Sequence, residues 1–149
     1  MTKTKLTEIL QKRSIQYTEV GKWGKYLRGV WEREFAEAIS SDERGKIYMD
    51  HFLWHIFSYE KVEAYEKDHA RQAFDKEAKD SVYVFYQHLD LAYLIENAKD
   101  TIAEDFKDEQ DIYIVNTEFQ WTYVNTHESA CGPYFYHKTS TTALLKNDL

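Results

Sequence analysis

The chain has 149 residues and a mass of 17.8 kDa, which is the size of one ordinary domain with its own hydrophobic core. Hydrophobic residues make up 43% of it and aromatic residues 16%, and this composition excludes a disordered chain. The net charge of -7 repels phosphate backbones, so we expect no nucleic-acid partner, although residues 1–33 carry eight basic and only three acidic side chains.

Cys131 is the only cysteine, which excludes an internal disulfide and a site built from several thiolates. No stretch has the apolar length of a signal peptide or a membrane span. We therefore expect a soluble, cytoplasmic protein without a membrane partner, and no motif calls for a cofactor.

Three segments have the periodicity of helices. They are residues 4–13, where Thr4 is a candidate cap, residues 21–39, whose apolar stripe includes Trp23, Trp31 and Phe35, and residues 60–80. Gly29 lies inside the second of these segments and costs about 1 kcal/mol relative to alanine, so packing there must compensate. The sequence predicts three helices.

Runs of β-branched and aromatic residues predict the strands. These runs are residues 14–20, 51–59, 81–88, 91–96, 111–115 and 119–125. Short polar connections favour antiparallel hairpins through Leu89 and Asp90 and through residues 116–118. We expect an α+β domain over residues 1–137, with a mainly antiparallel sheet of about five or six strands and three helices packed on one face. Residues 138–149 have the composition of a weakly ordered tail.

The motif HFLWH places His51 and His55 four residues apart, as in zinc-binding helices, but Phe52 occupies the position of the glutamate in a metalloprotease motif. In a strand the two histidines would be about 13 Å apart and could not bind one ion together. A weaker metal hypothesis combines His55, His88 and His127 from adjacent strands.

The stretch THESAC brings His127, Glu128 and Cys131 within five residues, which suggests a thiolate activated by a histidine in a small hydrolase or transferase. The expected context is missing, because Gly132 and Pro133 follow the cysteine where a helix should begin. The alternative is a small apolar thiol beside a turn.

Alternation along residues 119–127 predicts that Phe119, Trp121, Tyr123, Asn125 and His127 share one face of a strand, with the rings toward the core. The chain also has more Tyr and Trp than one small core can cover, and such rings at element edges are typical of protein interfaces. The candidate binding residues are Trp121, Tyr123, His127, Glu128, Tyr134 and Tyr136.

Six segments are familiar when taken in order: KWGKYLRGVWEREFA, LWHIFSYEK, YVFYQH, AYLIENA, DIYIVNTEFQWTYVNTHE and CGPYF. Over residues 15–136 the chain resembles the YneK-like family of small bacterial proteins, a domain of unknown function. The resemblance implies a soluble, single-domain, cytoplasmic protein and supplies no catalytic residues.

The leading hypothesis is a non-enzymatic α+β module that masks a protein partner, as an immunity-type or phage-borne inhibitor does. The alternative is an enzyme that uses His127, Glu128 and Cys131. The sequence leaves the oligomeric state open.

Overall fold

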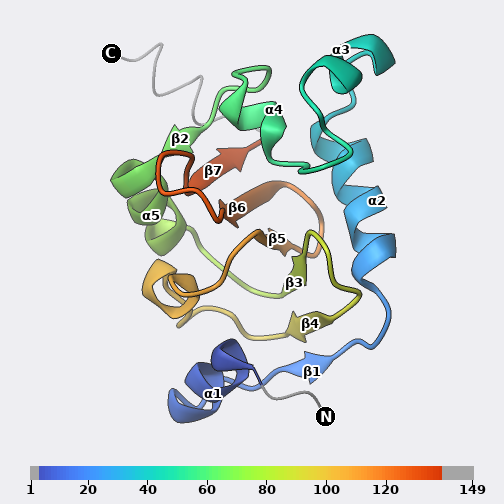
Figure 1. Cartoon of the computed structure of the whole chain (residues 1–149). Helices are drawn as coiled ribbons and strands as arrows, with labels where there is room; N and C mark the ends of the chain where they lie inside the picture. Colours follow the sequence, from blue (N-terminus) through green and yellow to red (C-terminus); the bar gives the residue numbers. More distant parts are fainter. Residues whose placement is uncertain (1–3, 139–149) are drawn as a thin grey trace.

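The computed structural model describes residues 4–138, and a seven-stranded sheet runs through this part of the chain (Figure 1). The strand order is β1-β4-β3-β5-β6-β7-β2, and every neighbouring pair is antiparallel. The strands are β1 (Thr18–Glu19), β2 (Tyr65–Glu66), β3 (Val82–Tyr86), β4 (Ala92–Ile95), β5 (Ile112–Asn116), β6 (Trp121–Asn125) and β7 (Tyr134–His137). The predicted antiparallel sheet is confirmed, but it has more strands than expected.

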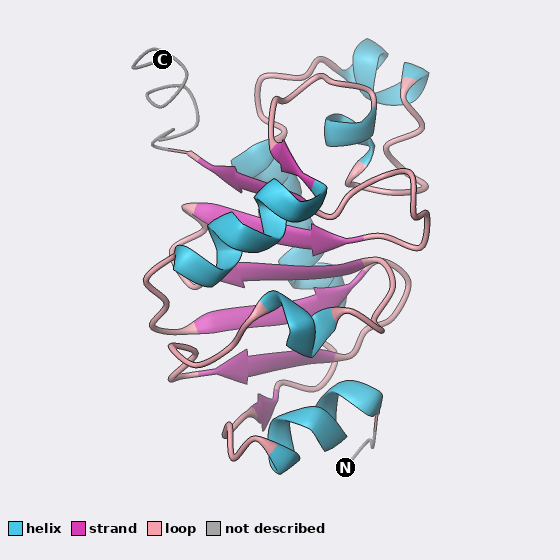
Figure 2. Cartoon of the chain, turned by 90° about the vertical axis from the view of Figure 1, so that its left-hand side faces the viewer, coloured by secondary structure: helices cyan, strands magenta, loops and turns pink. Residues whose placement is uncertain are grey.

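Helices cover both faces of this sheet. They are α1 (Lys5–Lys12), α2 (Gly24–Phe35), α3 (Ser41–Lys46), α4 (His55–Ser58), α5 (Lys67–Lys76) and the short 3-10 helix η1 (Ala103–Phe106). Figure 2 shows α1, η1 and α5 in front of the sheet, while α2 lies behind it. The prediction of three helices on one face was therefore wrong. Within residues 4–138 no helix combines the length and apolar character needed to cross a bilayer.

Alternating side chains divide the core into two clusters. On the face of α1 and α5, Val84, Ile114 and Tyr123 pack against helix residues such as Phe74. On the face of α2, a second cluster contains Leu27, Trp31, Phe35, Phe85, Tyr113, Val115 and Val124. A strand buried on both faces reads as a continuous apolar run, and this explains the composition of VYVFY and IYIV.

Hydroxyl side chains cap the N-termini of helices α1 and α3. Thr4 Oγ1 accepts a hydrogen bond from Thr7 N at 3.1 Å, and Thr4 N donates to Thr7 Oγ1 at 2.8 Å. The predicted Thr4 cap is thus confirmed. At α3, Ser40 is the cap, since Ser40 Oγ accepts from Glu43 N at 3.2 Å.

Residues 51–59 do not form the predicted strand. They make turns and the single-turn helix α4, and the side chains of Gln87 and Tyr113 satisfy two of their backbone amides. Leu53 N donates to Gln87 Oε1 at 2.9 Å, and Trp54 N donates to the Tyr113 hydroxyl at 3.2 Å. The segment therefore lies on one face of the sheet instead of joining it.

The predicted helix over residues 60–80 is also shorter than expected. Its first part makes a turn and a bend that lead into β2, where Tyr65 pairs with Phe135 of β7. Lys67 then adopts a φ of 54°, which turns the chain into α5. At the other end of the domain, Lys138 pairs with Glu34 and donates its backbone N–H to Gln120 O at 2.7 Å, so the domain includes this residue. The rest of the predicted tail lies outside the described residues.

Candidate functional site

The end of β6 brings His127 against Asp111, which precedes β5. His127 Nδ1 lies 3.0 Å from both carboxylate oxygens of Asp111. Asp111 Oδ1 also accepts from His127 N at 3.2 Å and from Trp54 Nε1 at 2.9 Å. The carboxylate therefore fixes the ring orientation of His127 and favours the proton on Nδ1, which makes Nε2 the nitrogen suited to accept a proton.

Glu128 and Cys131 share a polar cavity of about 360 Å³ with His127. Burial and the neighbouring Glu128 raise the pKa of the Cys131 thiol, which is the opposite of the shift that activates a nucleophile. Thr126 Oγ1 donates to the carbonyl of Cys131 and closes the turn. The three predicted residues are thus close together, but the thiol is in a setting that holds it neutral.

Three of the predicted binding residues are core residues. Trp121, Tyr123 and Tyr134 are each 2% exposed. The predicted inward face of β6 is confirmed for Trp121 and Tyr123, whereas Phe119 lies in the other cluster, on the face of α2. These rings stabilise the fold and leave little surface for a partner.

Tyr136 is half-buried, and its ring packs 6.0 Å from Phe35 and 6.2 Å from Phe57. Of the predicted binding residues, His127 and Glu128 are the exposed ones.

The three histidines of the metal hypothesis surround one aromatic ring. The centroid of Phe52 lies 5.4 Å from that of His55, 5.2 Å from His88 and 4.9 Å from His127. His55 Nδ1 is 2.6 Å from the carbonyl oxygen of Ile47. Among the described residues no three His, Cys, Asp or Glu side chains are placed to hold an ion, so these histidines form an aromatic contact cluster.

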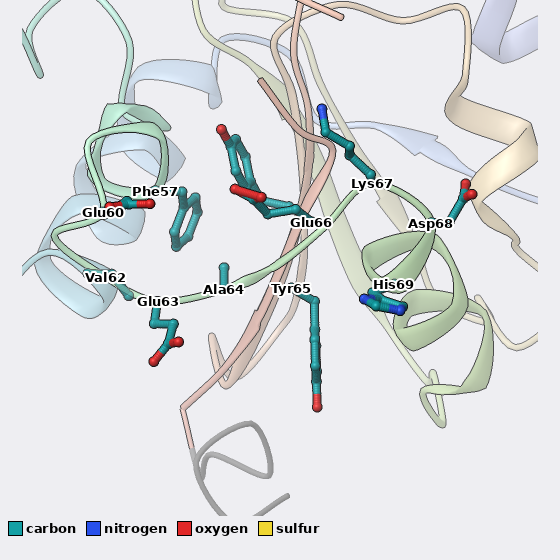
Figure 3. A pocket seen from close by; sticks show the side chains of 11 residues that line it. Phe57, Glu60, Val62, Glu63, Ala64, Tyr65, Glu66, Lys67, Asp68 and His69 are labelled. Carbon is teal, nitrogen blue, oxygen red and sulfur yellow. The ribbon is translucent and has the colours of Figure 1, made fainter. Parts of the chain in front are cut away.

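A groove of about 870 Å³ follows the edge strand β2, and the sequence reasoning did not identify it. It is lined by residues 62–69 together with Phe57, Glu60 and Tyr134. Figure 3 shows how the side chains of residues 63–66 are directed, with Glu63 and Tyr65 on one side of the chain and Ala64 and Glu66 on the other. We refer to this feature as the β2 groove.

Both apolar and acidic groups line the β2 groove. Phe57 and Tyr134 form its aromatic floor, with ring centroids 5.4 Å apart, and Val62 and Ala64 are half-buried beside them. Carboxylates stand along the rim at Glu60, Glu63, Glu66 and Asp68. The groove therefore combines a site for apolar side chains with a negative field.

Lys67 connects the β2 groove to the turn after β6. Its backbone N–H donates to Pro133 O at 2.9 Å, and its Nζ donates to the carbonyl oxygen of Ala130 at 3.1 Å. The ammonium group is therefore directed at the turn, as Figure 3 also shows by its course away from His69. The one lysine of the groove lining thus contributes little to its rim.

The sequence contained no regular strand pattern at the β2 groove. In KVEAYE the residues Ala64 and Tyr65 are consecutive and interrupt the alternation, and the segment lies within a charged stretch that favours a helix. Asp111 had no signal at all, because its partners Trp54 and His127 are 57 and 16 residues away.

Comparison with known proteins places the chain in one family. The model of a domain of unknown function, DUF4275, matches residues 4–135, and the chain belongs to this family. Neither a curated protein nor a solved structure matches it.

Proposed function

We propose that this member of the DUF4275 family is a non-enzymatic protein-binding module and that its contact site is the β2 groove. The observation that carries the proposal is an open sheet edge beside a lined groove. Since β2 is the last strand in the sheet, no strand within residues 4–138 pairs with its outer edge. Open edges are the sites at which extended segments of other proteins add to a sheet.

A comparison with the groove at the opposite edge of the sheet, beside β1, supports β2 as the contact site. The groove beside β1 is larger, about 1170 Å³, but Tyr17 is the one aromatic residue in its lining. The β2 groove is lined by Phe57, Tyr65 and Tyr134. Aromatic side chains are enriched at protein interfaces and supply most of the binding free energy there.

The proposal also includes the specific role suggested by the sequence, that of an immunity-type or phage-borne inhibitor. A stoichiometric inhibitor of immunity or phage type needs one exposed contact surface and no catalytic group, and the β2 groove fits this role. A bacterial, YneK-like and cytoplasmic protein is consistent with the resemblance and with a single unpaired cysteine, Cys131.

Capture of a partner from cells that carry the gene tests the contact site. Ala64 is half-buried in the groove, whereas Ala78 is exposed and lies after α5, outside the groove. We expect the wild-type protein and Ala78→Trp to capture the same partner and Ala64→Trp to lose it, with circular dichroism confirming that both variants fold. Capture by Ala64→Trp at the wild-type level would contradict the assignment.

A second candidate function is hydrolysis with His127 as general base. The observation in its favour is the contact of 3.0 Å between His127 Nδ1 and Asp111, an arrangement that orients the base in many hydrolases. The test is the release of nitrophenol from an activated ester, comparing the wild-type protein with His127→Ala and with His88→Ala as control. Equal rates in all three proteins would remove this candidate.

A further inference from the structure

We infer that the β2 groove receives a basic, extended segment of another protein, which adds to the sheet as a strand on the outer edge of β2. This inference rests on the proposed function and specifies the occupant. It follows from three properties of the groove: the direction of its backbone groups, its mixed apolar and acidic lining and its charge.

The backbone of β2 directs hydrogen-bonding groups into the groove. Tyr65 and Lys67 face β7, since Tyr65 is opposite Phe135 and Lys67 N donates to Pro133 O at 2.9 Å. In an antiparallel pair, successive residues direct their N–H groups to opposite edges. The N–H groups of Ala64 and Glu66 therefore point to the outer side, with the two-residue spacing that an added strand requires.

The side chains lining the groove specify a partner that is both apolar and basic. Phe57, Val62 and Ala64 offer apolar surface, while Glu60 and Glu66 stand at the rim. Ala64 and Glu66 lie on the same side of the chain (Figure 3), so apolar and acidic groups are neighbours along the groove. The matching segment carries aliphatic side chains together with lysine or arginine.

The charge of the rim determines the class of partner. Asp68, one of the rim carboxylates, is paired with Arg71 at 2.5 Å. The carboxylates of Glu60 and Glu66 add to a chain whose net charge is already -7. This field attracts a basic segment and repels nucleic acid and a second copy of the chain. Charged edge strands also prevent self-association.

A synthetic peptide tests the occupant directly. The probe is an acetylated and amidated peptide of alternating lysine and valine, about six residues long, the usual length of a strand. We expect it to bind, and we expect its affinity to fall as salt is added, because salt screens exposed charges. Two N-methylated peptides are compared, one methylated at the odd-numbered amides and one at the even-numbered amides. Only one of them should lose binding, since only one set of N–H groups faces β2.

Two charge-matched variants locate the binding site. Glu60→Gln/Glu66→Gln neutralises the rim of the β2 groove, and Glu66 makes no side-chain cap at α5. Glu96→Gln/Asp100→Asn makes the same change of net charge beside β1. We expect about tenfold weaker peptide binding for the first variant and a change of less than about twofold for the second.

The results that overturn the inference differ from those that overturn the proposed function. Equal loss in both variants, or undiminished binding of both N-methylated peptides, would mean that the peptide responds to net charge alone. No peptide binding, combined with a captured partner that Ala64→Trp loses, would leave the contact site intact and remove the basic strand as its occupant. Self-association that competes with the peptide would assign the edge to a second copy.

Discussion

At the scale of single residues, Asp111 joins several segments through its carboxylate. Its φ of 51° places it in the left-handed region, and its carboxylate receives one indole, one backbone and one imidazole N–H. Trp54, which donates the indole N–H, is fully buried. Asp111 thus links the segment before α4 to the end of β6.

We expect Asp111→Ala to lower the free energy of unfolding by about 2 kcal/mol, because the buried indole N–H of Trp54 loses its acceptor. Asp111→Asn keeps an oxygen acceptor and tolerates the left-handed backbone, so it should cost less than about 1 kcal/mol. Urea denaturation of both variants measures the difference. Equal losses would show that the carboxylate does not act through this hydrogen bond.

Cys131 allows a second test at the residue scale. Burial and Glu128 raise the pKa of its thiol, so we expect iodoacetamide to alkylate it at neutral pH more slowly than free cysteine. Glu128→Gln should accelerate the reaction, whereas Glu118→Gln, an exposed change in the hairpin before β6, should not. Alkylation faster than that of free cysteine would contradict this expectation and would support Cys131 as a thiolate nucleophile.

Sequence alone could predict the residues whose roles follow from local alternation. Trp121 and Tyr123 were placed on the inward face of their strand because side chains alternate across a strand. Asp111 could not be found in this way. Its role depends on contacts between segments that no local pattern connects.

At the scale of elements, helix α2 contains two glycines with different surroundings. A Cβ on Gly24 would lie 2.5 Å from the carbonyl oxygen of Leu89 and 2.8 Å from the Cα of Asp90. A Cβ on Gly29 would meet only the far end of Arg33, at 3.9 Å. The first glycine permits close packing of α2 on the hairpin between β3 and β4, and the second has no such steric reason.

We therefore expect opposite effects of alanine at these two positions. Gly29→Ala should raise the free energy of unfolding by about 0.8 kcal/mol through helix propensity. Gly24→Ala should lower it by about 2 kcal/mol, because rigid backbone atoms must move apart. Thermal denaturation of the two variants provides the check, and destabilisation by Gly29→Ala would show that the space beside it is not open.

Elements were predicted best where the local pattern and the tertiary contacts agree. The strands around the two hairpins were found, since each has alternating apolar residues and a short connection. Residues 51–59 have the composition of a strand, but Gln87 and Tyr113 bind their amides and hold them against the sheet. Such long-range side-chain partners have no counterpart in local composition.

At the scale of the whole molecule, the two cores enclose many tyrosines. Burial raises the pKa of five of them: Tyr86, Tyr93, Tyr113, Tyr123 and Tyr134. The folded state keeps these hydroxyls protonated at pH values where the unfolded chain, with a tyrosine pKa of about 10, releases its protons. The stability that they contribute is complete below about pH 10 and is lost as the pH rises further.

We expect alkaline unfolding above about pH 10, with a loss of up to about 1.4 kcal/mol per pH unit for each tyrosine that ionises only on unfolding. Tyrosinate absorbance and far-ultraviolet circular dichroism should change together in one transition. Ionisation of all twelve tyrosines before any loss of secondary structure would contradict the burial described above.

The arrangement of layers was only partly predictable. An antiparallel sheet followed from the short connections, but coverage of both faces depends on the paths of α2 and of residues 36–57, which pack on the face opposite α5. Figure 1 shows that the chain after α4 returns to the sheet edge at β2. Most of the residues that line the β2 groove belong to this part of the chain. The position of the groove is therefore a property of the folded molecule.

Hydrogen exchange of individual backbone amides tests the central claim, the β2 edge as contact site, most directly. On addition of a captured partner or of the alternating lysine and valine peptide, we expect slower exchange at Ala64 and Glu66 and unchanged exchange at Thr18 and Glu19 of the opposite edge. Protection at β1 instead, or a bound complex with no protection at Ala64 and Glu66, would contradict the account.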